Sequence, residues 1–254
     1  MKKLVTILLS GSFVLSGIAA IAQNETTAYP DLSYPKNNVK LNLLALPLNT
    51  YSVQYERGLT DNISLSLGVR FQPKTGLPFK GLIRNMISES DTNGMQIINN
   101  TRISNWAITP EFRYYFGKKP LNGFYVAPFA RIGGYTLAFD YTYTGSDGED
   151  FFLGFDGKGT AFTGGLMLGS QWHVGKHFLL DWWIAGASFG KLNFDLDAQT
   201  DLSDMSAEDR AELERVLEDV FTDLAVTVTD QGAKAKGSAP IVDLKIGFCI
   251  GYTF

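Results

Sequence analysis

The sequence predicts an all-β fold: an eight-stranded antiparallel transmembrane β-barrel with short periplasmic turns, long outer loops and an amphipathic helix in the last loop. Three observations lead to this prediction. In the C-terminal segment Ile241–Phe254, every second residue from Val242 is apolar, and the residues between them are charged or small, as in a strand with one apolar face. Similar alternating segments recur between turns. Beyond residue 22, no apolar run approaches the roughly 20 residues of a membrane-spanning helix.

Residues 1–22 are predicted to be an export signal that is not part of the fold. Lys2 and Lys3 precede an apolar run, and Ala20-Ile21-Ala22 forms an A-x-A cleavage site before Gln23. The alternative, a membrane anchor, would need a stop-transfer charge cluster after the apolar run, and none follows. We therefore expect an exported chain with a polar N-terminal lead, residues 23–38, on the periplasmic side.

The composition argues against nucleic acid as a partner. Without Lys2 and Lys3 the chain has 20 basic and 26 acidic residues, a net charge of −6, whereas nucleic-acid binding requires basic patches. The single cysteine, Cys249, cannot form an internal disulfide, so an exported chain needs another stabilising device, such as closure of its sheet. Abundant glycine and 33 aromatic residues (18 Phe, 11 Tyr and 4 Trp) suit a barrel with aromatic girdles.

The predicted barrel region is 39–254, and its first half contains four predicted strands. Alternation places the first three at 39–46, 51–58 and 63–71, and the fourth follows Ser104. Between the third and fourth strands, residues 72–104 do not alternate. Their apolar side chains recur instead at helical spacing, which predicts a short amphipathic helix containing Phe79, Leu82, Ile83, Met86 and Ile87.

The second half predicts four more strands, at 124–143, 160–173, 178–190 and 241–254, with a Gly/Asp-rich loop at 145–159. The connections after the second, fourth and sixth strands are short, and those after the third, fifth and seventh are long. Bacterial outer-membrane barrels show this asymmetry and an even strand number. The barrel must close because no water inside a bilayer can satisfy open backbone groups.

The last outer loop, 191–239, is acidic, with 12 acids against five bases. Ser206 and Asp209 resemble a capping box. Six apolar residues then follow at helical spacing: Leu213, Val216, Leu217, Val220, Phe221 and Leu224. This stripe is interpreted either as packing on the barrel rim or on the helix near Leu82, or as a partner-binding face. The spacing of Asp195, Asp197 and Asp201 lacks the glycine and terminal Glu of an EF-hand loop, so we expect no metal and no cofactor.

Several segments resemble the small eight-stranded outer-membrane barrels that include the OmpA transmembrane domain, and are similar to a Bacteroidota barrel family of unassigned function. They are Asn38–Leu44, Val53–Arg57, Thr109–Tyr115, Gly123–Pro128 and the terminal Phe254. The helix-bearing final loop departs from this pattern. The resemblance implies location in the cell outer membrane, contact with outer-membrane lipid and lipopolysaccharide, and insertion by the barrel assembly machinery. The assembly signal would be Phe248, Ile250, Tyr252 and Phe254.

Charged residues at inward positions are the candidate functional constellation. A barrel of eight strands has room for side chains but not for a channel, and buried charges have to be paired. We therefore expect an ion-pair network that fills the lumen. Its members are Glu56, Arg70, Glu111, Arg113, Arg131, Asp181, Asp243 and Lys245, with Lys40 as a further member. The alternatives are a proton or ion path and catalytic carboxylates.

Three hypotheses about function remain open. The first is a non-enzymatic barrel whose loops contact lipopolysaccharide or protein partners, and the second is a narrow channel or small-molecule binder. The third, an outer-membrane lipid-modifying enzyme, would need a Ser/His/acid cluster near the outer rim. His173 and His177 lie instead at the predicted periplasmic rim, and Gly175 occupies the position where such enzymes carry a serine. We expect no catalytic residue.

Overall fold

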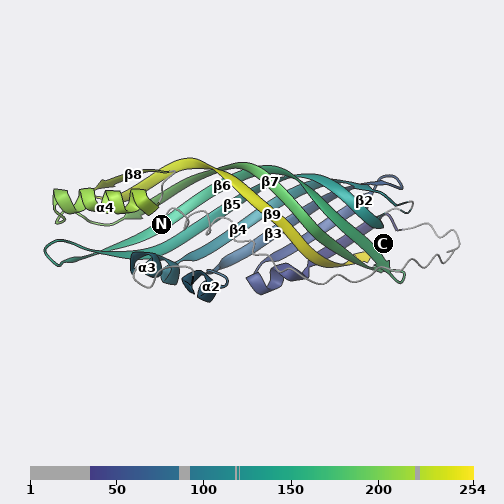
Figure 1. The fold of residues 1–254 in the computed structure, drawn as a ribbon, viewed down its shortest axis with the longest axis horizontal. Coiled ribbons are helices and arrows are strands. Elements are labelled where there is room, and N and C mark those ends of the chain that lie inside the picture. Colours follow the sequence, from purple (N-terminus) through teal and green to yellow (C-terminus); the bar gives the residue numbers. More distant parts are fainter. Residues whose placement is uncertain (1–34, 86–91, 118, 120, 221–223) are drawn as a thin grey trace.

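The computed structural model describes residues 35–85, 92–117, 119, 121–220 and 224–254, and its strands close into a β-barrel (Figure 1). The eight-stranded antiparallel ring predicted from the sequence is confirmed: β1 to β7 follow one another, and β9 pairs with both β7 and β1. The elements are β1 (Asn37–Asn42), η1 (Leu43–Leu48), β2 (Tyr51–Gly58), β3 (Ile63–Gly76), α2 (Lys80–Asn85), α3 (Thr92–Asn100), β4 (Arg102–Tyr115), β5 (Gly123–Thr144), β6 (Asp150–Val174), β7 (Phe178–Gln199), α4 (Ala207–Val220), β8 (Leu224–Thr229) and β9 (Gly232–Thr253).

The outer surface of the ring carries an apolar band. On β3, Leu65, Leu67 and Val69 are exposed, while Ser64 and Ser66 between them are buried in the lumen. On β9 the large exposed apolar residues run from Val242 to Tyr252. Those ten residue steps, at about 3.3 Å each and a tilt of about 40°, rise about 25 Å. This height matches the apolar band of a barrel that spans a bilayer.

Strand length differs strongly around the ring. β1 and β2 have 6 and 8 residues, whereas β5, β6, β7 and β9 have 22, 25, 22 and 22. About 9–11 residues cross a bilayer, so the long strands continue well beyond the band. We call this projection the arm. It consists of β5 after Ile132, β6 before Phe162, β7 after Phe189 and β9 before Val242, together with β8 and α4. In Figure 1 the arm is at the end of the molecule opposite the C-terminus.

Parts of two predicted loops form strands in the arm. Most of the predicted loop 145–159 belongs to β6, and the predicted helix-bearing loop 191–239 begins and ends inside β7 and β9. The alternation continues there: Leu192, Leu196 and Ala198 are buried, and the acidic residues between them are not. These strands extend because the arm has an apolar core of its own, described below.

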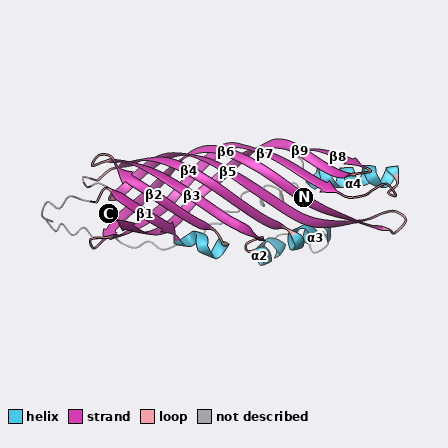
Figure 2. Ribbon diagram, turned by 180° about the vertical axis from the view of Figure 1, so that it is seen from behind, coloured by secondary structure: helices cyan, strands magenta, loops and turns pink. Residues whose placement is uncertain are grey.

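The side of the ring that contains the short strands β1 and β2 also differs from the prediction. The first strand ends at Asn42 rather than Leu46, because the Asn42 side chain accepts a hydrogen bond from the Leu44 backbone N–H (3.0 Å) and starts the 3₁₀ helix η1. The predicted helix near Leu82 is described as α2 over Lys80–Asn85, while its predicted members Met86 and Ile87 lie outside the described residues. The helix α3 was not predicted; Figure 2 shows η1, α2 and α3 along this side. Asn37 and Asn38 of the predicted lead belong to β1, whereas the predicted export signal, 1–22, lies outside the described residues.

The arm core joins five strands and two helices. The Phe139 and Phe155 rings stack with centroids 4.7 Å apart, and Leu213 and Leu217 of α4 and Ile97 of α3 pack into the same buried cluster. Of the predicted apolar stripe, the structure thus buries Leu213 and Leu217, leaves Val216 half-buried and places Leu224 in β8 rather than on the helix. The Val220 side chain and Phe221 lie outside the described residues.

The N-terminus of α4 is fixed by a reciprocal cap. The Asp209 backbone N–H donates to the Ser206 hydroxyl (3.0 Å), which donates to the Asp209 carboxylate (2.7 Å). The same carboxylate accepts from the backbone N–H (3.1 Å) and hydroxyl (3.2 Å) of Ser146 in the β5–β6 turn. Asp209 therefore joins the helix to the tip of the arm.

We predict that α4 loosens at acidic pH. The Ser206 hydroxyl, followed by the Ser146 donors, lowers the pKa of Asp209 below its ordinary value. Because the folded pKa is depressed, this contribution to stability is present above the unfolded-state pKa, about 3.9, and is lost as the pH falls through the folded value. Hydrogen exchange of the α4 amides, corrected for intrinsic rates, should show constant protection from pH 7 to about 5 and a loss below about 4. In Asp209→Asn the protection should be lower and should lack this acid-dependent step; an unchanged step would assign it to another group.

Candidate functional site: an ion-pair network in the lumen

Four strands from around the ring bring five charged residues to one level of the lumen. Lys40 lies on β1, Glu56 on β2, Glu111 and Arg113 on β4, and Asp181 on β7. The ladder pairs Glu56 with Ser66, and Ser66 with Glu111. Because side chains on a strand alternate between faces, this register points both carboxylates inward at the same height.

Arg113 is the centre of the network. Its guanidinium lies 2.8 Å from the Asp181 carboxylate, 2.9 Å from Glu111 and 3.4 Å from Glu56. Lys40 Nζ adds contacts to Glu56 (2.6 Å) and Asp181 (2.7 Å). All five side chains are fully buried. Each carboxylate therefore has a cationic partner, as burial in a low-dielectric interior requires.

Neutral side chains satisfy most of the remaining polar atoms. The Tyr115 hydroxyl donates to Glu56 (2.7 Å), and the Tyr125 hydroxyl (2.7 Å) and Trp183 indole (3.1 Å) donate to Asp181. Gln54 and Gln171 accept from Arg113 (2.7 Å) and Lys40 (3.0 Å). The sequence prediction missed these five residues as members of the network. Their inward position on the predicted strands was the available signal.

A second layer of charges lies toward the arm. Lys245 bonds to Glu111, and Arg131 bonds to Asp243 and to the Thr109 hydroxyl (3.2 Å). Lys245 also lies over the Trp183 ring, 4.5 Å from its centroid. The structure therefore brings together all of the predicted lumen charges except one.

Arg70 differs from the prediction, which placed it in the ion-pair network. Among the described residues it has no salt bridge, and its guanidinium donates only to the Tyr135 hydroxyl, at 3.4 Å. Its ladder neighbours on β2 and β4 are Ser52 and Ala107, which carry no charge. The carboxylates lie at lower levels and are already bonded to other cations.

The inward carboxylates on the described strands take part in ion pairs. Glu56, Glu111, Asp181 and Asp243 are each bonded to a cation. No group of three or more His, Cys, Asp or Glu side chains in the described part of the chain could hold a metal ion. His173 and His177 flank the β6–β7 turn. Nor does this part contain a helix long and apolar enough to cross a membrane.

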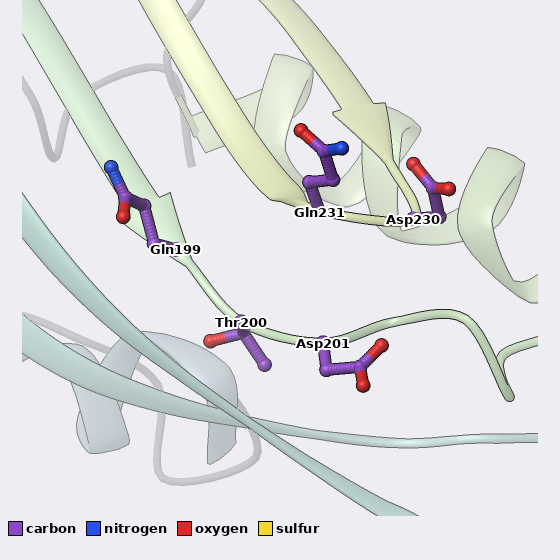
Figure 3. Close-up of a pocket in the computed structure, with 5 residues that line it drawn as sticks. All are labelled: Gln199, Thr200, Asp201, Asp230 and Gln231. Carbon is purple, nitrogen blue, oxygen red and sulfur yellow. The ribbon is translucent and has the colours of Figure 1, made fainter.

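The arm carries a separate hollow of about 340 Å³, drawn in Figure 3. It is lined by Gln199, Thr200, Asp201, Asp230 and Gln231, at the point where β7 ends and the β8–β9 turn begins. The hollow is wide open to solvent and its side chains come from exposed turns. Nothing in this geometry selects a ligand.

The predicted assembly signal lies at the end of the barrel. Ile250, Tyr252 and Phe254 are exposed on the outer face, and Phe248 is half-buried. The four side chains therefore form one apolar row along β9, and their role in assembly stays a prediction.

The chain is similar to a protein family and to solved structures. A solved structure, the N-terminal β-barrel domain of Pseudomonas aeruginosa OprF, matches with 12% identity, 87% of this chain covered, 98% of that chain covered and a TM-score of 0.23. No curated protein matches the sequence. A family described as "Protein of unknown function (DUF3575)" matches residues 13–198. Because this match spans well over half of the 254 residues, the chain belongs to that family.

Proposed function

We propose that the protein is a non-enzymatic outer-membrane barrel that does not conduct ions and that holds the arm at the cell surface, where the arm contacts lipopolysaccharide or a protein partner. The observation that carries the proposal is the arm itself. Four barrel strands extend beyond the apolar band and, with α4, bury a second hydrophobic core. A rigid, independently packed projection is suited to recognition, because little conformational entropy is lost when it binds.

The closed lumen favours this function over a narrow channel. Lys40, Glu56, Arg113 and Asp181 form a continuous set of salt bridges between side chains with no solvent exposure. Such a layer leaves no aqueous path at its level, and opening it would separate buried charges at a cost of several kcal/mol. Planar bilayers containing the purified barrel should therefore show no stepwise conductance. Reproducible unitary steps would favour the channel hypothesis instead.

Cysteine labelling in intact cells tests where the arm lies. Glu218 is exposed on α4, Lys176 is exposed in the β6–β7 turn at the other end, and the native Cys249 is buried. A membrane-impermeant maleimide should therefore label Glu218→Cys in intact cells, and Lys176→Cys only after the outer membrane is permeabilised. Wild type, with only the buried thiol, gives the background. The reverse pattern would place the arm in the periplasm and overturn the proposal.

A further inference from the structure

The inward charges of the barrel do not balance, and the excess is a cation. Five inward residues are basic and four are acidic, and every acid is bonded to a cation other than Arg70. The inward-facing residues, all in described strands, are Lys40, Arg70, Arg113, Arg131 and Lys245 against Glu56, Glu111, Asp181 and Asp243. An uncompensated charge inside a barrel wall is costly, so this position favours an anion.

Unused hydrogen-bond donors lie beside this cation. The Arg70 Nε is buried without a partner, and so is the Gln54 Nε2, on a side chain that is 2% exposed. The Gln54 amide lies against Gly68, one inward position below Arg70 on β3. The Arg131 Nε donates to Thr109, which pairs with Gly68, so a second guanidinium lies on the strand level just below Arg70. One oxyanion would satisfy the unused donors, because a guanidinium binds an oxyanion through paired N–H groups.

Across β2 from Arg70, the wall beyond the end of β1 is a helix rather than a strand. On β9, the pairing with β1 ends at Cys249, opposite Asn42, and the pairing with β8 begins at Gly237. The helix η1 lies beside β9 between these two ladders. The η1 side chains Leu43, Leu44 and Leu46 are exposed. Gln72, one inward position above Arg70, donates to the Leu48 carbonyl at 3.0 Å. The Leu48 end of η1 therefore lies one inward position above Arg70, and the exposed leucines of η1 extend from there toward β1.

We propose that Arg70 and Gln54 bind the oxyanion head group, a phosphate or a carboxylate, of a single-chain amphiphile whose apolar chain lies along η1. The positive charge and the donors select the head group, and the exposed leucines cover the chain. The inference uses the proposed membrane location, in which such amphiphiles are available. It does not depend on the arm having a partner.

Titration of the purified full-length chain in non-ionic detergent tests the site. Dodecyl phosphate should bind saturably by calorimetry, inorganic phosphate should bind more weakly, and dodecyltrimethylammonium should not bind. Arg70→Gln should weaken dodecyl phosphate binding by about tenfold or more, since it removes a charge-assisted contact. Arg102→Gln, which removes an exposed cation outside the lumen, is the matched control and should bind like wild type.

Folding is checked for each variant by heat-modifiable migration on gels, and Arg70→Lys, which keeps the charge, should retain part of the binding. Equal affinity for phosphate and dodecyl phosphate, both lost in Arg70→Gln, would support the oxyanion site and identify its source as solution anions. Binding that is the same in wild type and Arg70→Gln, or absent for both phosphates, would overturn the proposal. Such a failure leaves the cysteine-labelling result unchanged, so the two proposals fail separately.

Discussion

Arg113→Met is expected to destabilise the barrel by about 3–5 kcal/mol, because it leaves buried carboxylates without their shared cation. Asp181, Glu111 and Glu56 all contact this one guanidinium. Lys40 and Lys245 remain near them, but each is already bonded to a carboxylate. Methionine would fill part of the space and satisfy none of the charge. Arg113→Lys should be intermediate, since an ammonium cannot reproduce the planar fork that reaches three partners.

The measurement is equilibrium unfolding by urea in lipid vesicles, followed by heat-modifiable migration. Arg57→Met is the matched control: Arg57 is exposed near the end of β2 that lies away from the arm, so its loss should change the free energy of unfolding by less than about 0.5 kcal/mol. Similar small effects from both substitutions would mean that the lumen network does not stabilise the barrel.

Leu67→Arg is expected to destabilise the barrel by about 2–4 kcal/mol in a bilayer, because it places a charge on the lipid face near the middle of the apolar band. Leu67 is 48% exposed and pairs with Tyr55 and Pro110 on the neighbouring strands. On a surface that met water, the same substitution would change stability by no more than about 0.5 kcal/mol. The size of the effect therefore distinguishes lipid from water.

Asn193→Arg gives the comparison at a position above the band. Asn193 is also an exposed, outward residue of a barrel strand, but it lies on the arm part of β7. In the same vesicle assay it should be close to neutral. Equal costs at Leu67 and Asn193, whether both large or both small, would contradict the assignment of the apolar band.

The ring could be predicted from the sequence because its signal is local. Alternation along β3 and β9 is visible within a dozen residues, and a closed ring follows once those faces meet lipid. The outer limits of the strands were harder to predict. The alternation of Leu192, Leu196 and Ala198 was present in the sequence, but the acidic residues among them suggested a loop. The strand forms because Leu196 and Ala198 pack into the core of the arm with α4, and Leu192 packs with Ala161 and Ile241.

The pairing of the lumen charges could not be predicted in the same way. Alternation indicates that Arg113 and Asp181 both point inward, yet they are 68 positions apart and meet only because the ring closes. Arg70 satisfied the same sequence criterion and has no acidic partner, because its level of the lumen contains Ser52 and Ala107 instead. Partner choice depends on strand register, which a pattern in a single strand does not contain.

Two adjacent tryptophans on β7 test whether neighbouring residues of each barrel strand face lipid and lumen in turn. Trp182 is 38% exposed on the outer surface, and Trp183 is 5% exposed inside. Single-tryptophan variants, with the other three replaced by phenylalanine, are reconstituted in vesicles whose acyl chains carry bromine. Bromine should quench Trp182 fluorescence strongly and Trp183 fluorescence weakly. Equal quenching of the two, or stronger quenching of Trp183, would contradict this alternation.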